Sequence, residues 1–294
     1  MKILIDNDSN MNFEVNSTAR KIFNFIFIPI LNILPVKTNF LIRRSHKSVD
    51  EVVENATTHA ALEVLYKKGH KHHTINTFQK LSHAIWFNTN NSKAVRNRLK
   101  IVKRELTVLL KELSVNTEKI KIVSIASGSA RAIVESIVEA NLPSNLSISS
   151  TFVDKSQNAL SYSKELLNAS SLANNHNHNY DWVNATAGSF LRNEAENTYD
   201  IIEMVGLLDY FDDEKAIDIF RSIHKDLNIG GTFITANICP NEEQKFLTKI
   251  IKWEMVYRRA EDLASLLIKA GFEESSILIL YEPLKVHCIA IAKK

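Results

Sequence analysis

Cysteine is scarce in this 294-residue chain, which contains only Cys239 and Cys288. Two thiols that lie far apart in sequence do not suggest the framework that stabilises small disulfide-rich proteins. Their scarcity fits a reducing compartment, and the polar first twenty residues show no secretory signal. We therefore expect a cytoplasmic protein. Apolar residues make up 45% of the chain, which is enough for a sizeable core.

The chain also lacks a strong charge of either sign. Its formal net charge is +3, which gives no reason by itself to expect nucleic acid as a partner. The basic residues are unevenly spread, however, because five of them crowd the segment between Arg96 and Arg104. Apolar residues recur there at steps of three and four. We expect a long helix over Ala94–Leu113, with the basic residues on solvated faces.

No apolar run is long enough to predict a membrane-spanning helix. The stretch Ile22–Val36 is strongly apolar but shorter than the roughly 20 residues of a span. It also contains Pro29 and Pro35, which disfavour a continuous helix. We expect this segment to be buried or to cover the rest of the protein. The alternative is an apolar lid or an anchor on a membrane surface, because several basic residues follow closely.

The pattern of the chain changes near residue 118. Before it, periodic apolar residues predict helices, one of them over Val49–Lys67. After it, short runs rich in β-branched residues alternate with helical stretches, which is typical of a mostly parallel sheet with helices on both faces. The expected strands are Ile120–Ala126, Ile148–Val153, Tyr180–Val183, Tyr199–Val205, Thr232–Ile238, Ile277–Leu280 and Val286–Ala292.

The predicted fold class is therefore α/β, in two parts. A helical N-terminal region (1–117) precedes a domain built on the sheet (118–294). The short link Glu282–Lys285 joins the last two strands, so they should form an antiparallel hairpin.

A turn of small residues, Ser124 to Ala130, follows the first expected strand and leads into a helix. Such a turn lets a ligand approach the backbone, and helix N-terminal amides then face the ligand. The next strand ends at Asp154, 26 residues after Gly128, where a carboxylate can accept hydrogen bonds from a ribose diol. An ordinary turn and a helix-capping Asp154 are the alternatives. Either a dinucleotide or S-adenosylmethionine suits this pattern.

The fourth strand adds a family resemblance. Tyr199-Asp200 opens this strand, and the turn Leu227–Gly231 precedes the next one. With the small-residue turn, these motifs resemble class I, Rossmann-like S-adenosylmethionine-dependent methyltransferases over about residues 118–294. Shorter stretches, Gly206–Tyr210 and Trp253–Arg258, are similar to bacterial methyltransferases that make methyl esters of 3-hydroxy fatty acids.

The chain departs from the family pattern at three positions of the first turn. Ser124 stands where the family has an acid that positions the methionine end of the cofactor, so that contact is missing from this strand. Ala126 and Ala130 stand where the family has glycines, whereas Gly128 is kept.

The resemblance implies S-adenosyl-L-methionine as the cofactor. Its binding residues would be Ala126, Ser127, Gly128, Arg131, Asp154, Lys155, Asn184, Ala185, Thr186, Glu203, Met204, Val205 and Gly206. The acceptor would be a small molecule, apolar or with an acyl chain, methylated on a carboxyl or hydroxyl oxygen. The candidate catalytic residues on the acceptor side are Asp209, Tyr210, Tyr257 and His59. Trp253 and Tyr257 lie four apart on an expected helix, where simple core packing is the alternative.

Three other functions stay open on the sequence. An RNA methyltransferase would use the basic segment, although that segment lacks the interleaved aromatic residues of an RNA platform. A Rossmann NAD(P)-dependent oxidoreductase fits the single glycine and the final hairpin poorly. A non-catalytic scaffold is favoured by the missing acid at Ser124. We expect no metal site, because the clusters His70–His73 and His176–His178 have no cysteine nearby. No feature indicates an oligomeric state.

Overall fold

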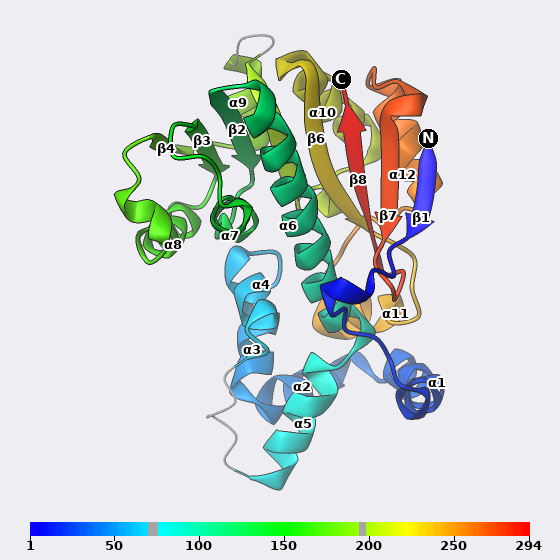
Figure 1. Cartoon of the computed structure of the whole chain (residues 1–294). Coiled ribbons are helices and arrows are strands. Elements are labelled where there is room, and N and C mark those ends of the chain that lie inside the picture. Colours follow the sequence, from blue (N-terminus) through cyan, green and yellow to red (C-terminus); the bar gives the residue numbers. More distant parts are fainter. Residues whose placement is uncertain (70–75, 194–197) are drawn as a thin grey trace.

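The computed structural model describes residues 1–69, 76–193 and 198–294, and an eight-stranded sheet lies at its centre. The strand order is β1-β7-β8-β6-β5-β2-β3-β4 (Figure 1). The strands are β1 (Lys2–Ile5), β2 (Lys119–Ile125), β3 (Ser147–Asp154), β4 (His178–Asn184), β5 (Tyr199–Val205), β6 (Leu227–Ile238), β7 (Ile277–Tyr281) and β8 (His287–Lys293). Strand β8 is antiparallel to β6 and β7, and the other pairs are parallel. The predicted fold class and final hairpin are confirmed.

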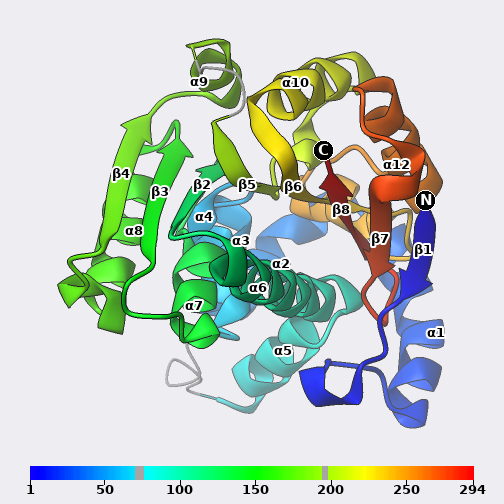
Figure 2. The same ribbon diagram turned by 45° about the horizontal axis from the view of Figure 1, so that its top comes forward.

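Helices form the N-terminal region and connect the strands. The N-terminal helices are α1 (Thr18–Ile33), α2 (Asn39–Ser45), α3 (Lys47–Glu54), α4 (His59–Tyr66), α5 (Thr77–Phe87) and α6 (Asn90–Asn116). The later helices are α7 (Arg131–Ala140), α8 (Gln157–Asn168), α9 (Ala187–Asn193), α10 (Asp213–Asp226), α11 (Gln244–Phe246), which continues as a π-helical turn over Leu247–Ile251, and α12 (Ala260–Lys269). Helices α1 to α5 gather beyond one end of the sheet, and α6 runs from them along it (Figures 1 and 2).

The strands bury both faces of the sheet. Side chains alternate along a strand, so Ile201 packs with α6 and α7 on one face while Ile202 packs with α10 and α12 on the other. The predicted apolar stripe of α6 forms part of the first layer through Val102 and Leu106. Because both faces are covered, the edge at which the parallel strands end is left to build a site.

Strand β1 was not expected, because four residues are too few for a periodic pattern. It pairs in parallel with β7 at the edge of the sheet. Just after it, Asp6 forms an ion pair with Arg104 of α6, with 2.6 Å between Oδ2 and Nη2. The beginning of the chain therefore joins the sheet, and the long helix fastens it there.

The single helix expected over Val49–Lys67 is wrong, because the chain folds there as α3 and α4. Between them, the Asn55 side-chain amide donates to the Glu51 carbonyl at 2.9 Å, and the Thr58 hydroxyl donates to the Asn55 carbonyl at 2.8 Å. Such local bonds compete with the helical ladder, and Thr57 adopts a positive φ of 73°. The break matters because it directs the 55–59 segment toward the end of the sheet.

The expectation that the basic residues of α6 are solvated is also wrong for its first turns. Arg96 is buried and makes a bidentate pair with Glu14, with Nε–Oε1 and Nη2–Oε2 distances of 2.6 and 2.9 Å. It also donates to the carbonyls of Leu65 at 3.2 Å and Phe87 at 2.7 Å. Arg98 is buried as well. Helical periodicity missed this because other elements surround the start of α6 on several sides.

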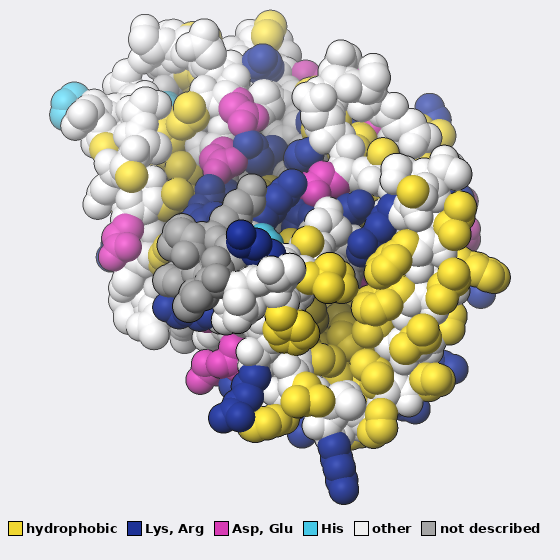
Figure 3. Space-filling view, turned by 90° about the horizontal axis from the view of Figure 1, so that it is seen from below, with side chains coloured by type: hydrophobic (Ala, Val, Ile, Leu, Met, Phe, Trp, Pro, Cys, Tyr) yellow, Lys and Arg dark blue, Asp and Glu magenta, His cyan; other side chains and the backbone are white. Residues whose placement is uncertain are grey.

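Of the two placements expected for the segment 22–36, burial is wrong for much of its apolar surface, whereas its inner side does cover the rest of the protein through Leu31 and Leu34. Most of it belongs to α1, which continues through Pro29. Ile28 faces inward, but Phe25 is 82% exposed and Ile33 is 79% exposed. Figure 3 shows hydrophobic side chains gathered on this face of the molecule. Among the described residues no single helix is long and apolar enough to cross a membrane; α1 and the stretch Val36–Ser45 pass that test only together, and the chain bends by 108° between them.

We predict that Arg96→Met lowers the free energy of unfolding by roughly 3 kcal/mol, because it removes the bidentate partner of a partly buried Glu14 carboxylate and a donor to each of two carbonyls. Chemical denaturation monitored by circular dichroism measures the change. The control is Arg221→Met, which removes an exposed pair with Asp218 and should cost less than about 1 kcal/mol. Equal effects of the two substitutions would show that the Arg96 pair does not organise this end of the fold.

Candidate functional site

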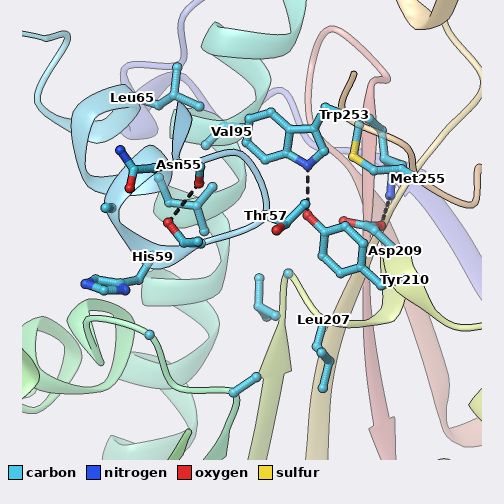
Figure 4. A pocket seen from close by; sticks show the side chains of 18 of the residues that line it. Asn55, Thr57, His59, Leu65, Val95, Leu207, Asp209, Tyr210, Trp253 and Met255 are labelled. Carbon is cyan, nitrogen blue, oxygen red and sulfur yellow. Dashed lines mark hydrogen bonds between the residues drawn. The ribbon is translucent and has the colours of Figure 1, made fainter. Parts of the chain in front are cut away.

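A cavity of about 1020 Å³ lies between the ends of the parallel strands and the N-terminal helices. Figure 4 shows side chains from both parts of the chain pointing into it. Of the predicted residues, it is lined by His59, Ala126, Gly128, Asp154, Lys155, Ala185, Thr186, Val205, Gly206, Asp209 and Tyr210. A smaller cavity of about 60 Å³ adjoins it and adds Ser127, Arg131 and Glu203. Asn184, Met204 and Tyr257 line neither cavity.

The turn after β2 keeps a glycine-like backbone even where it lacks glycine. Ala126, Gly128 and Ala130 all have positive φ angles, of 53°, 54° and 54°. Each alanine in this region costs roughly 1–2 kcal/mol of backbone strain, and such strain concentrates at functional sites. A Cβ atom at Gly128 would lie 3.3 Å from the Cβ atom of His59. The turn therefore passes close to α4, and Ala126 and Gly128 border both cavities.

Asp154 is fixed at the end of β3 by this turn. Its Oδ2 accepts from the Gly128 amide at 2.9 Å, and its Oδ1 accepts from the Ser156 amide at 2.8 Å. Each oxygen keeps a further lone pair, and the side chain borders the cavity. The side-chain amide of Asn184 donates to the backbone carbonyl of Asp154 at 3.0 Å. Asn184 therefore supports Asp154, whereas Ala185 and Thr186 face the cavity itself.

A carboxylate from the neighbouring strand stands beside Ser124. Ser124 and Glu203 are direct partners in the β2–β5 ladder, and the Ser124 hydroxyl donates to Glu203 Oε2. Burial raises the pKa of Glu203 to about 7, opposed by hydrogen bonds from Ser124 and the Val205 amide and by the charge of Arg98. The acid that the first strand lacks is thus supplied by β5 at the same level of the sheet.

Arg98 is a further candidate, and the sequence analysis missed it. It is only 2% exposed, yet it borders both cavities. Its Nε is fully buried and has no hydrogen-bond partner among the described residues, and its charge acts on Glu203 and Asp209. One signal was available: Arg98 lies three residues after Val95 and four before Val102, within the apolar stripe of α6.

Among the acceptor-side candidates, Asp209 and Tyr210 lie just after β5, and Tyr257 lies in the segment 252–259. Asp209 is buried, its Oδ1 accepts from the Ile238 amide at 2.8 Å, and burial raises its pKa. The Trp253 indole donates to the Tyr210 hydroxyl at 2.8 Å (Figure 4). Burial is the main cause that raises the pKa of Tyr210 to about 12, so this phenol is a hydrogen-bonding group at neutral pH rather than a base.

The helix expected to carry Trp253 and Tyr257 is absent, and residues 252–259 form neither helix nor strand. The Val256 amide donates to the Asp209 carbonyl at 2.7 Å, and the Asn237 side chain donates to the Val256 carbonyl at 2.8 Å. These bonds to neighbouring elements replace helical ones. Trp253 consequently reaches the cavity, whereas Tyr257 packs in a separate cluster.

Three further predicted residues, Arg131, Met204 and His59, contact other parts of the protein. Both Nε and Nη2 of Arg131 donate to the Glu63 carboxylate, at 2.9 and 2.6 Å, which ties α7 to α4. Met204 of β5 is fully buried in the core. His59 borders both cavities, and its ring centroid lies 5.9 Å from that of Tyr162.

No group of three or more His, Cys, Asp or Glu side chains is placed to hold a metal ion within the parts of the chain that the structure describes. The predicted loop cluster His70–His73 lies outside these residues. His178 belongs to β4 and contacts the Tyr180 hydroxyl at 3.1 Å.

No protein-family model matches the chain, and no curated protein matches its sequence. Solved structures do match. A possible exported protein from Bordetella parapertussis is 14% identical, with a TM-score of 0.66 over 95% of this chain and 99% of that chain. Magnesium protoporphyrin IX methyltransferase from Synechocystis PCC 6803, solved with bound SAH, is 11% identical, with a TM-score of 0.52 over 75% of this chain and 88% of that chain. At these identities the likeness shows the fold alone, and that fold resembles the one of S-adenosylmethionine-dependent methyltransferases.

Proposed function

We propose that this chain is an S-adenosyl-L-methionine-dependent methyltransferase whose acceptor is a small molecule with an apolar or acyl part and a carboxylate. One observation carries the proposal: a single cavity joins the Gly128–Asp154 turn to an apolar chamber, and the buried guanidinium of Arg98 lies at its border. The first half suits a nucleoside, and the second suits an apolar acid. The fold shared with methyltransferases supports this proposal.

The cofactor half has groups that fit each part of S-adenosylmethionine. The free lone pairs of Asp154 would accept from the ribose hydroxyls, and Ala185 and Thr186 would lie beside the adenine. Glu203, placed by Ser124, supplies a carboxylate for the positively charged methionine end. At Gly128 a Cβ atom would lie only 3.3 Å from the Cβ atom of His59, so a side chain there would crowd the border between the turn and α4. When bound, the cofactor supplies a methyl group on a sulfonium centre.

The acceptor half is mainly apolar. It is lined by Val52, Leu62, Leu65, Trp86, Val95, Phe246, Leu247, Trp253 and Met255. Such a chamber excludes water from an acyl chain. Arg98 would orient a carboxylate by charge-assisted hydrogen bonds, and an ionised carboxylate needs no general base to accept a methyl group. The contribution of the protein is then alignment of the two reactants.

The structure weakens the grounds for the three alternatives. RNA binding was based on basic residues of α6, but Arg96 and Arg98 are buried and Arg104 pairs with Asp6. The scaffold alternative was based on the missing acid at Ser124, and Glu203 now lies there. An oxidoreductase of the Rossmann type gains no observation in its favour.

We predict that Asp154→Ala weakens binding of S-adenosylhomocysteine by about 1–3 kcal/mol, because two charge-assisted hydrogen bonds to the ribose are lost. Calorimetry measures the affinity, and a melting curve checks that the turn still folds. Asp181→Ala, on the neighbouring strand β4 and away from the cavity lining, is the control and should bind as the parent does. Unchanged affinity in Asp154→Ala would remove this residue from the site.

The raised pKa of Glu203 predicts a pH-dependent affinity for S-adenosylmethionine. With a pKa of about 7 the carboxyl is mostly neutral below that pH and mostly ionised above it, and a cationic ligand prefers the ionised form. Affinity should therefore rise up to roughly tenfold from about pH 6 to about pH 8. Glu203→Gln should remove this rise, and Glu139→Gln on α7 should keep it. A rise that persists in Glu203→Gln would assign the titration to another group.

We predict that Arg98→Lys raises the KM for a medium-chain fatty acid by roughly 10- to 100-fold, because lysine cannot reproduce a two-pronged contact with a carboxylate. Initial rates at saturating S-adenosylmethionine give the KM. Arg192→Lys is the matched control, since Arg192 borders the same cavity from α9. Equal KM values in Arg98→Lys and the parent would exclude Arg98 from acceptor binding.

A further inference from the structure

Helix α1 is apolar on both sides, although such a helix normally lies in a core. Its inner side is anchored by Ile28 and by Asn32, whose amide donates to the Glu242 carbonyl at 2.8 Å. Its outer side carries Phe25 and Ile33, which are among the most exposed apolar side chains of the described residues. Single exposed apolar residues need no explanation, but a contiguous group of them marks an interaction surface.

Neighbouring helices extend this outer side into one surface, which we call the apolar end face. Helix α2 lies against the turn at Val36–Thr38 and against α5, and these elements share one end of the molecule (Figure 1). The exposed apolar side chains of the face are Ile22, Phe23, Phe25, Ile26, Ile30, Ile33, Val36, Phe40, Leu41, Phe78 and Leu81. Figure 3 shows hydrophobic side chains around a hollow on this side of the molecule.

Basic side chains predominate around the apolar end face, although Glu242 and Glu254 are exposed near it. Residues 15–49 contain six basic side chains and no acidic one. Asp50, the next acid, is paired with Arg43. The guanidinium of Arg44 lies 4.2 Å from the ring centroid of Phe40, so cation and apolar surface are in direct contact. The exposed basic residues of this end are Lys21, Lys37, Arg44, Lys47, Lys80, Lys245, Lys249 and Lys252.

We propose that the apolar end face docks on the surface of an anionic lipid bilayer, with α1 and α2 lying in the plane of the interface. Exposed apolar side chains flanked by Lys and Arg are what such a surface binds. A second copy of the chain fits less well, because a two-fold contact through this face would bring its cations against the same cations of the partner. This proposal does not depend on the proposed reaction.

The apolar end face also connects with the cavity. Leu31, Leu34 and Ile42, on the inner sides of α1 and α2, pack against the cluster that contains Trp86 and Phe246. Both of those residues line the acceptor half of the cavity. If the proposed function holds, docking of this face would bring the acceptor half of the cavity close to an acyl acceptor held in the membrane.

Flotation of the full-length protein with lipid vesicles tests the docking. The vesicles are phosphatidylcholine alone or phosphatidylcholine with about one-third phosphatidylglycerol. We expect binding to the anionic vesicles, which falls as salt is raised from about 0.1 M to about 0.5 M. The double variant Phe25→Ser and Ile33→Ser should lower the partition coefficient about tenfold or more. Both side chains are exposed, so its melting temperature should match that of the parent.

The matched control is Val115→Ser with Ile229→Ser, which removes side chains that are 81% and 87% exposed and lie outside the apolar end face. It should bind vesicles as the parent does. The proposal is overturned if the parent ignores anionic vesicles or if Phe25→Ser with Ile33→Ser binds them equally well. It is also overturned if light scattering shows a dimer that this variant loses while vesicles stay unbound. Affinity for S-adenosylhomocysteine, measured on the same samples, tests the proposed function separately.

Discussion

A guanidinium removed from water needs partners for its donors, and this requirement at Arg96 organises the helical end of the molecule. Its bonds fix the N-terminal segment at Glu14 and the ends of α4 and α5 against one turn of α6. Side chains two residues apart point to nearly opposite sides of a helix. Burying Arg96 and Arg98 together therefore requires that other elements surround α6, and the cavity lies where Arg98 emerges on the second side.

The proposed cofactor site shows that a charge can be kept while its position in sequence changes. Ser124 and Glu203 are cross-strand partners, so a carboxylate from β5 reaches the level that an acid on β2 would occupy. The turn after β2 is a second case, because Ala126 and Ala130 hold a backbone conformation that glycine adopts without strain. In both places the chain has the geometry that the resemblance implies, although the residue type differs.

Local patterns predicted the sheet well, because each strand is a short apolar run and the final link is too short for a crossover. They also indicated Gly128, Asp154 and Asp209 as site residues, and all three line one cavity. They failed at the break between α3 and α4, where local side-chain bonds of Asn55 compete with the helix. They also failed where tertiary contacts decide the outcome, because the 252–259 segment depends on partners far away in the sequence. Arg98 was missed because a charged side chain was expected to be exposed, but it is buried. Burial was expected for the apolar side chains of α1, but several of them are exposed.

Helix α6 has 27 residues, a length of roughly 40 Å at 1.5 Å per residue. Its first turns bind the N-terminal helices, and its later turns pack on β2 and α7. It therefore spans both halves of the cavity as one rigid rod. A hinge at residues 117–118, where the chain changes from helical to α/β, could not separate the two halves, since the rod belongs to both. Any change in the width of the cavity would fall instead to the short elements packed against α6, and α3, α4 and the linker between them all contribute to its lining.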